Sequence, residues 1–306
     1  MKNNLLAYLA LGAICLIWGT TYLALRIGVL HFPPFLFGLI RQVSAGALLT
    51  GALLLSRKAP TPSFSDIKYQ AIAGFFMITL GNGLVGWAEV HIPSGIAAVI
   101  CSIVPLVIIL INLTAYREEK PNIPIIIGSI MGFAGIIMIF GGDLSQFNNP
   151  DYQLGILGAF VAVMGWAGGS VWLKRRKTQT NPFMNAGLQM FFGGLWLAPF
   201  SLAFDDLNTV TWSAEAGYAL LYLTVFGSLI AFSCYIYALR RLPVTIVTLH
   251  AYVNPIIAVV LGWAILNETL NVTMWIAIML TVSGIYVVNR GNQLRGQWKA
   301  QLTSQR

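Results

Sequence analysis

The chain has 306 residues, of which 57% are hydrophobic and only 9% are charged, whereas a soluble domain carries about 25% charged residues. This composition excludes an ordinary soluble enzyme, a disordered chain and a nucleic-acid-binding domain. The net charge of +8 comes from Lys and Arg residues scattered between long apolar runs, a distribution typical of membrane proteins with charge-sorted loops.

Ten apolar stretches follow one another, each close to the roughly 20 residues that a helix needs to cross a bilayer. The runs do not alternate, as strands of a membrane barrel do, and we interpret the first run as a span rather than a cleaved signal peptide. Glycines at 141–142 and 291 predict helix ends. The sequence therefore predicts an all-α integral membrane protein with transmembrane helices over about 5–25, 34–56, 69–89, 94–116, 122–141, 154–173, 183–204, 216–238, 244–266 and 271–289.

The charge distribution orients these spans. With a cytoplasmic N-terminus, 14 of the 18 Lys and Arg residues fall in inner segments, and we assign Arg26, Arg240 and Arg241 to the outer side. This bias predicts that both termini are cytoplasmic and that the protein lies in the inner (plasma) membrane. The basic run Lys174–Lys177 is interpreted as a topology determinant, with a lipid-headgroup or regulatory site as the alternative.

The two halves of the chain resemble each other. Gly12 matches Gly158, and Gly135 matches Gly284, in the same order along both halves. Because each half has five predicted spans, an odd number, the second copy enters the membrane from the opposite side, which predicts two inverted five-helix repeats. Three residues of the fourth span recur in the ninth at a single offset of 150, so that Pro93, Pro105 and Glu118 match Pro243, Pro255 and Glu268.

Trp18-Gly19-Thr20 in the first span, Arg41 early in the second and the paired prolines and glutamates resemble the EamA branch of the drug/metabolite transporter superfamily. The resemblance covers residues 5–290 and implies a secondary transporter whose first, third, fourth, sixth, eighth and ninth helices surround a central cavity. Two positions depart from the family, since Met164 replaces a tryptophan and Gln189 stands where Arg41 would recur. The implied units are one EamA-like repeat over 1–148, another over 149–290 and a cytoplasmic tail over 291–306.

Two prolines and one arginine stand out within the spans. Pro105 and Pro255 each free a backbone carbonyl one turn earlier, and we interpret them as helix kinks that act as hinges, with static bending as the alternative. Arg41 is the clearest charge inside a span, where an unpaired charge costs at least a few kcal/mol. It either holds a substrate carboxylate or has a structural role, and its recurrence in the family favours the structural role.

Three titratable residues are candidates for proton coupling, namely Glu89, His91 and His250. Glu89 and His91 end the third span near the outer interface. We favour a solvated loop carboxylate for Glu89 over a buried proton carrier or a partner of Arg41. His250 lies well inside the ninth span, where it either bonds neutrally to a backbone carbonyl or lines the cavity.

Intramembrane amides and aromatic residues complete the candidate cavity. The amides bond across helices or present donors to a ligand. Aromatic residues on the cavity helices form an apolar box with polar tips, although aromatic residues near helix ends are often interface anchors instead. The predicted substrate cavity comprises Trp18, Tyr22, Arg41, Asn82, Trp166, Tyr235, His250 and Asn254.

Transport is the function that this sequence favours. It carries no nucleophile elbow, zinc-helix motif or nucleotide loop, so we expect no catalytic residue, metal or cofactor, and an intramembrane enzyme or a channel is the weaker alternative. We expect a secondary-active or facilitative exporter of amino acids or related small metabolites by alternating access, with multidrug or amine efflux as an alternative. The expected partners are the substrate, the lipid bilayer and candidate coupling protons, but no nucleic acid, in a monomer or homodimer.

Overall fold

The computed structural model describes residues 5–57, 60–115, 123–141, 148–176, 180–242, 244–247, 250–267 and 272–304. These residues form helices and connecting turns, and no strand occurs among them. In chain order the elements are α1 (Leu5–Val29), α2 (Pro34–Leu55), α3 (Phe64–Gly74), η2 (Phe75–Gly83), α4 (Leu84–His91), α5 (Ser94–Cys101), α6 (Val104–Thr114), α7 (Ile123–Gly141), α8 (Pro150–Lys174), α9 (Pro182–Leu195), α10 (Leu197–Phe204), η4 (Leu207–Thr209), α11 (Ala214–Tyr222), η5 (Leu223–Phe232), α12 (Ser233–Arg241), α13 (Val244–Val247), α14 (His250–Leu266) and α15 (Val272–Ser304).

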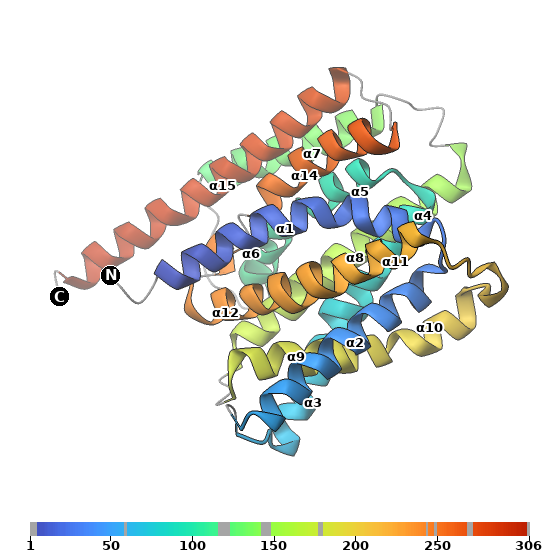
Figure 1. Ribbon diagram of the computed structural model, residues 1–306. Helices are drawn as coiled ribbons and strands as arrows, with labels where there is room; N and C mark the ends of the chain where they lie inside the picture. Colours follow the sequence, from blue (N-terminus) through green and yellow to red (C-terminus); the bar gives the residue numbers. More distant parts are fainter. Residues whose placement is uncertain are drawn as a thin grey trace.

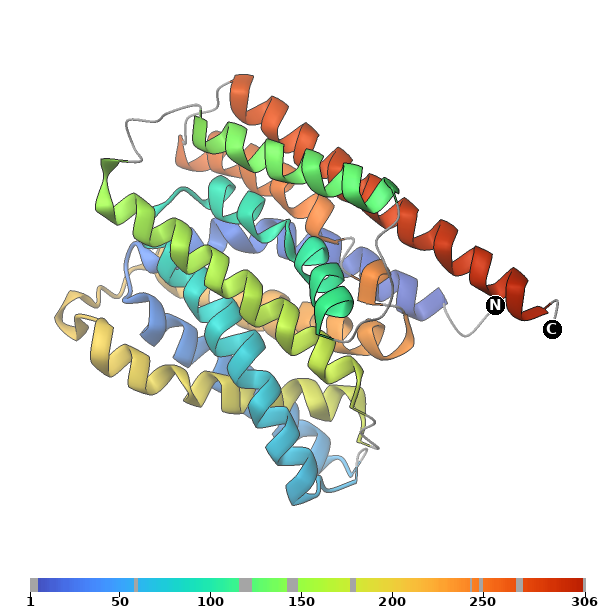
Figure 2. The ribbon, with the colours of Figure 1, turned by 180° about the vertical axis from the view of Figure 1, so that it is seen from behind.

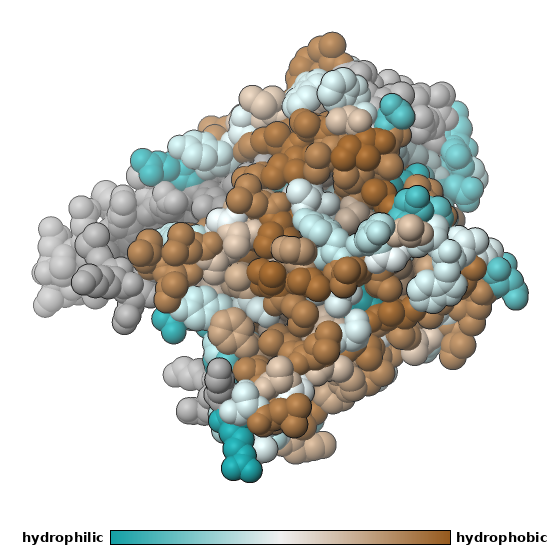
Figure 3. Space-filling model, viewed as in Figure 1, coloured by the Kyte–Doolittle hydropathy of each residue, from teal (hydrophilic) through white to brown (hydrophobic). Residues whose placement is uncertain are grey.

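Within the described part of the chain, seven helical segments are long and apolar enough to cross a membrane, and shorter apolar helices lie in α7, α14 and α15. Apolar residues cover most of the face seen in Figure 3, as expected for a surface in contact with lipid. The third segment starts at Phe64, earlier than predicted, because Ser63 and Asp66 form a capping box that begins the helix there.

The last helix differs from the prediction. Gly291 was expected to end it, but α15 continues to Ser304 through most of the predicted tail. A single glycine costs a helix only about 1 kcal/mol, and the residues that follow include several good helix formers. The structure therefore extends this helix beyond its apolar part.

The two symmetric prolines have different effects. In the fourth predicted span, α5 ends at Cys101 and α6 begins at Val104, with Pro105 in its first turn. The intervening turn tightens, since Ile103 N donates to Ile100 O over 3.2 Å. Pro255, in contrast, lies inside the continuous helix α14. The helix is thus broken next to Pro105, whereas it stays continuous through Pro255.

Two wide helical turns occupy matching places in the halves. The π-helical segment η2 lies between α3 and α4, and η5 lies between α11 and α12. Their first residues, Phe75 and Leu223, are 148 positions apart, close to the repeat offsets in the sequence. Because π-helical segments occur often at functional sites, this pair directs attention to the third and eighth spans.

The helices pack in a bundle in which distant parts of the sequence lie side by side (Figures 1 and 2). Helix α7 packs along α15, α2 along α9, and α1 along α14. Glycines allow the closest approach, since a Cβ added to Gly284 would lie only 2.5 Å from Gly128 O. These contacts bring residues of the first and second halves together throughout the bundle.

One end of the bundle is basic. The start of α1 and the end of α15 lie at this same end (Figure 1), which we call the basic end. Lys174 Nζ donates to Leu239 O and Leu242 O, and Arg240 donates to Thr180 O. The assignment of Arg240 and Arg241 to the side opposite Lys174 was therefore wrong, because the eighth span returns the chain to the side where α8 ends.

The opposite end is closed by a contact between the halves. Asp205, directly after α10, accepts hydrogen bonds from Phe35 N over 3.4 Å and from Leu36 N over 2.7 Å. Its carboxylate thereby caps the first turn of α2. Thr211 N also donates to His31 O over 2.9 Å. Both contacts fix the α10–α11 connection against the start of α2.

Candidate functional site

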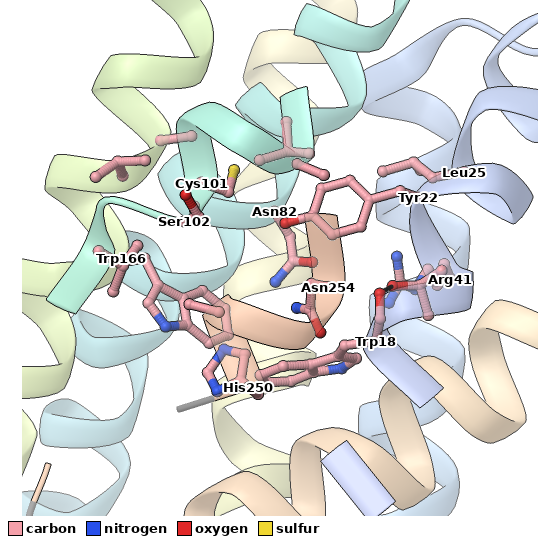
Figure 4. A pocket seen from close by; sticks show the side chains of 18 residues that line it. Trp18, Tyr22, Leu25, Arg41, Asn82, Cys101, Ser102, Trp166, His250 and Asn254 are labelled. Atoms are coloured by element: carbon pink, nitrogen blue, oxygen red, sulfur yellow. Dashed lines mark hydrogen bonds between the residues drawn. The ribbon is translucent and has the colours of Figure 1, made fainter. Parts of the chain in front are cut away.

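A cavity of about 90 Å³ lies inside the bundle between the two halves (Figure 4). The helices of the first half provide most of its wall, and α8 and α14 of the second half close it. The π-helical segment η2 contributes Gly81 and Asn82. The lining residues are Trp18, Thr21, Tyr22, Leu25, Arg41, Gly81, Asn82, Val85, Ala98, Cys101, Ser102, Val104, Ala162, Val163, Trp166, His250, Ala251 and Asn254.

Most of the predicted cavity residues meet at this place. Trp18, Tyr22, Arg41, Asn82, Trp166, His250 and Asn254 all line it. The exception is Tyr235, which is fully buried behind the wall and shares a hydrogen bond with Ser170 Oγ over 2.9 Å. Its polar tip is thus used inside the protein and does not reach the cavity.

Aromatic rings form one side of the cavity. The ring centroid of Trp18 lies 5.4 Å from that of Trp166 and 4.9 Å from that of His250, both in edge-on arrangements. Tyr235 supports Trp18 and Trp166 from behind, at 5.2 Å from each. Edge-to-face packing at these distances holds aromatic rings in defined orientations. The structure therefore presents a rigid apolar surface to any solute in the cavity.

Arg41 provides the charge of the site. It is only 5% exposed, and its Nε donates to Ser228 Oγ over 2.9 Å. Ser228 in turn donates to Gln42 Oε1 over 3.3 Å. This chain of bonds joins α2 to η5 and fixes one edge of the guanidinium, which also lines the cavity.

Glu89 lies behind the cavity wall. It is fully buried, so its interpretation as a solvated loop carboxylate was wrong; α4 packs between α1 and α8 and is covered by both. Its carboxyl group interacts electrostatically with Arg41 and with Tyr22. An acidic group therefore accompanies the arginine at the site without lining the cavity itself.

Three further polar residues of the wall differ in the hydrogen bonds that their side chains make. His250 Nδ1 lies 2.9 Å from Val247 O, so this residue both bonds to the backbone and lines the cavity. Asn82 Nδ2 donates to Met77 O over a long 3.4 Å. Asn254 is 4% exposed, and its Oδ1 has no hydrogen-bond partner in the described part of the chain. A buried acceptor without a partner is costly, and a bound solute could satisfy this one.

The remaining candidates lie outside the cavity lining. His91 packs against Trp87, with the ring centroids 4.7 Å apart, at the end opposite the basic one. Neither Pro105 nor Pro255 lines the cavity, although their neighbours Val104 and Asn254 do. No group of His, Cys, Asp or Glu residues in the described segments could hold a metal ion.

Sequence reasoning missed part of the wall. Thr21 lies three residues after Trp18, and Leu25 lies three residues after Tyr22. Since Tyr22 itself lies four residues after Trp18, all four share one face of α1. This spacing could have identified them. Ser228, which orients Arg41, carries no comparable signal, because its contribution depends on a helix packed from the other half of the chain.

Comparison with known proteins places the chain among membrane transporters. The model of the EamA-like transporter family matches residues 5–141 and again residues 153–290. An inner membrane transporter of Escherichia coli (strain K12), YedA, is 36% identical over 288 residues, which cover 93% of this chain and 91% of that protein. Protein PecM of Dickeya dadantii (strain 3937) is 26% identical over 278 residues, 89% of this chain and 88% of that protein. A crystal structure with 22% sequence identity covers 92% of this chain and 96% of its own, with a TM-score of 0.68, and shows that the fold is shared.

Proposed function

The chain belongs to the EamA-like transporter family, and from this membership we propose that it exports amino acids or related small metabolites across the inner membrane by alternating access. It is a membrane transporter and not an enzyme. The observation that carries the proposal is a small cavity between the two halves. It combines a buried guanidinium, an aromatic wall and an amide oxygen that has no hydrogen-bond partner among the described residues.

The chemistry of this cavity supports a small zwitterion as the substrate. Arg41 suits a carboxylate, and Asn254 Oδ1 suits an N–H donor such as an ammonium group. The rings of Trp18 and Trp166 suit an apolar side chain. Drug-sized ligands occupy pockets of about 300 Å³ or more, so the volume of about 90 Å³ favours small metabolites over multidrug efflux. Arg41 in the lining also favours a substrate that carries a carboxylate over a simple amine.

Helix contacts support an inverted repeat of two five-helix units with ten spans in all. A Cβ on Gly135 would lie 2.7 Å from Ala277 O, and one on Gly284 would lie 2.5 Å from Gly128 O. Gly135 and Gly284 are 149 positions apart, as are Gly128 and Ala277. Exchanging the halves therefore converts one contact into the other. Two interchangeable halves give inward-open and outward-open states of similar energy.

The charge distribution supports a cytoplasmic basic end. Placing Arg240 and Arg241 with Lys174 raises the basic residues on that side from 14 to 16 of 18. The start of α1 and the end of α15 lie there too. The positive-inside rule then puts both termini in the cytoplasm, for a protein that acts as a monomer or homodimer.

Coupling to protons is the second part of the proposal. Glu89 is buried near Arg41, and His250 lines the cavity, so both are placed where a proton could accompany the substrate. His91 lies at one end of the bundle and is the weaker candidate. If neither buried group takes up a proton, the protein is a facilitator that lets metabolites run down their own gradient.

The test is counterflow in liposomes. The purified protein is reconstituted and offered a panel of labelled amino acids and amine metabolites, with and without a pH gradient. We expect exchange of a class of amino acids, a strong loss in Trp18→Ala, and no change in Trp212→Ala, a control in which an exposed tryptophan outside the cavity is removed. Exchange of amines alone, or equal exchange by the two variants, contradicts the proposal.

A further inference from the structure

A second pocket, of about 220 Å³, opens at the basic end between α8, α9 and α12. We propose that it binds the phosphate group of an anionic phospholipid of the inner leaflet. Among the residues that the structure describes, three cations and one amide line it together with aliphatic side chains, without an Asp or Glu. These lining residues are Leu173, Lys174, Arg176, Asn185, Ile236, Leu239 and Arg240.

Each polar side chain of this pocket is held in place by the protein. Lys174 Nζ donates to the carbonyls of Leu239 and Leu242 at the end of α12. Arg240 donates to Thr180 O. Asn185, 2% exposed, accepts from Thr180 Oγ1 over 2.6 Å. The positive groups are thus fixed around one volume rather than spread through solvent.

Arg176 completes the arrangement from the rim. Its guanidinium carbon lies 5.4 Å from the ring centre of Tyr69 and 5.2 Å from that of Trp172. Stacking on ring faces orients the guanidinium and leaves its in-plane N–H donors able to meet an anion. Asn185 lies in the first turn of α9, whose dipole adds positive potential on the same side.

The energetics of the pocket favour an anion. Like charges held together repel one another, and the lining residues that the structure describes bring Lys174, Arg176 and Arg240 together without an Asp or Glu among them. A phosphate relieves that repulsion and accepts hydrogen bonds from all three side chains. Basic pockets between spans on the cytoplasmic side bind anionic headgroups for this reason.

The surroundings favour a lipid over free phosphate. Leu173, Ile236 and Leu239 give the pocket an apolar wall, which suits the glycerol and first acyl carbons of a phospholipid. Trp172 and Tyr237 lie nearby at the same end, where aromatic residues mark the headgroup level of a membrane. The predicted basic run at Lys174 therefore contributes to a binding pocket as well as to topology.

The amount of lipid that stays bound to the purified protein tests whether the pocket binds an anionic phospholipid. The full chain is prepared with phosphatidylglycerol or with phosphatidylcholine, and native mass spectrometry counts the lipids that stay bound. The test variant is Arg176→Gln with Arg240→Gln. The matched control is Arg241→Gln, which removes a neighbouring charge that stacks 4.6 Å over Tyr237 and does not line the pocket. Arg176→Gln alone provides a milder variant that leaves the bond from Arg240 to Thr180 intact.

We expect one tightly retained phosphatidylglycerol, little retained phosphatidylcholine, and a loss of affinity of about fivefold for each arginine removed, with the Arg241→Gln control unchanged. An excess of inorganic phosphate should not displace the lipid. Equal retention in wild type, test variants and control overturns the proposal, and so does displacement by inorganic phosphate at concentrations near that of the lipid. Because no transport is measured, the outcome is independent of the proposed substrate.

Discussion

The Nε of Arg41 in α2 donates to Ser228 Oγ in η5 over 2.9 Å, so the charge of the cavity is oriented by a residue from the other half of the chain. Trp18 makes the same connection one residue earlier, since its Nε1 donates to Gly227 O over 3.0 Å. Both bonds end on the π-helical segment η5. When the two halves move relative to each other, these hydrogen bonds must therefore either move with them intact or break.

Replacing Ser228 by Ala should weaken substrate binding without removing the charge. The substitution leaves Arg41 in place but removes the acceptor that orients it, at a cost of about 1 kcal/mol, or roughly fivefold in KM. Arg41→Gln should reduce exchange at least tenfold, because it removes the carboxylate partner itself. Counterflow at several substrate concentrations separates KM from the maximal rate. A larger effect from Ser228→Ala than from Arg41→Gln contradicts the assigned roles.

Asn254→Leu should separate transport from stability. The side chain is buried, and its Oδ1 lacks a partner in the described part of the chain. An apolar residue of similar size removes this unsatisfied acceptor, so the melting temperature should stay equal or rise. Transport should fall at least fivefold, because the substrate loses an acceptor. A lower melting temperature with unchanged counterflow would instead assign Asn254 a purely structural role.

The sequence predicts the spans because they depend on local composition. Long apolar runs with few charges appear in the chain itself. In the described segments, seven of them form helices long and apolar enough to cross a membrane, and shorter apolar helices lie in α7, α14 and α15. Features that depend on how the helices pack are harder to predict from the sequence. Glu89 looks like an interfacial loop residue in the sequence, yet the neighbouring helices bury it completely. Gly291 looks like a helix end, but one glycine is too small a cost to stop α15.

In the candidate site too, local sequence predicts some features, and packing decides the others. Trp18, Asn254 and His250 are unusual residues within spans, and this made them visible before the fold was known. Tyr235 meets the same criterion but faces Ser170 behind the wall, because spacing does not reveal the layer in which a side chain lies. The π-helical segments η2 and η5 contain no proline, and nothing in their local sequence distinguishes a π-helical segment from an ordinary α-helix.

Gly284→Ala should destabilise the protein far more than Gly12→Ala. A Cβ at Gly284 meets the backbone of α7 at Gly128 O and Gly132 N, both at 2.5 Å, whereas one at Gly12 meets nothing within 4 Å. Since backbone atoms cannot rotate away, we expect a loss of about 1–3 kcal/mol. Gly12→Ala should be neutral or stabilising by up to about 1 kcal/mol. Thermal unfolding in detergent measures both; equal melting temperatures would show that α7 and α15 do not pack closely.

Asp205 should make stability depend on pH. Burial raises the pKa of this carboxyl group above 3.8, although hydrogen bonds from Leu36, Ser201 and Phe35 act in the opposite direction. The folded protein then holds the proton at a higher pH than the unfolded chain does. Its contribution to the free energy of unfolding is therefore largest below pH 3.8 and falls as the pH rises through the folded-state pKa.

Asp205→Asn tests this linkage, because an amide does not titrate. The melting temperature of the wild type relative to Asp205→Asn should fall as the pH rises from 3.8 and level off above the folded-state pKa. The substitution keeps one acceptor for Leu36 N, so the cap of α2 is partly retained. A pH-independent difference between the two proteins would show that burial does not govern this carboxyl group.

Glu89→Gln decides whether the buried carboxyl group couples transport to protons. Glu89 is fully buried and interacts with Arg41, so a proton bound there would change the charge balance beside the substrate. Glutamine keeps the shape but cannot titrate. If Glu89 is the coupling group, a pH gradient should accelerate exchange by the wild type and have no effect on the variant. Glu215→Gln, which replaces a carboxylate outside the cavity lining, should respond like the wild type. Should Glu89→Gln keep the full response, His250→Ala becomes the deciding variant, since His250 is the titratable candidate that lines the cavity.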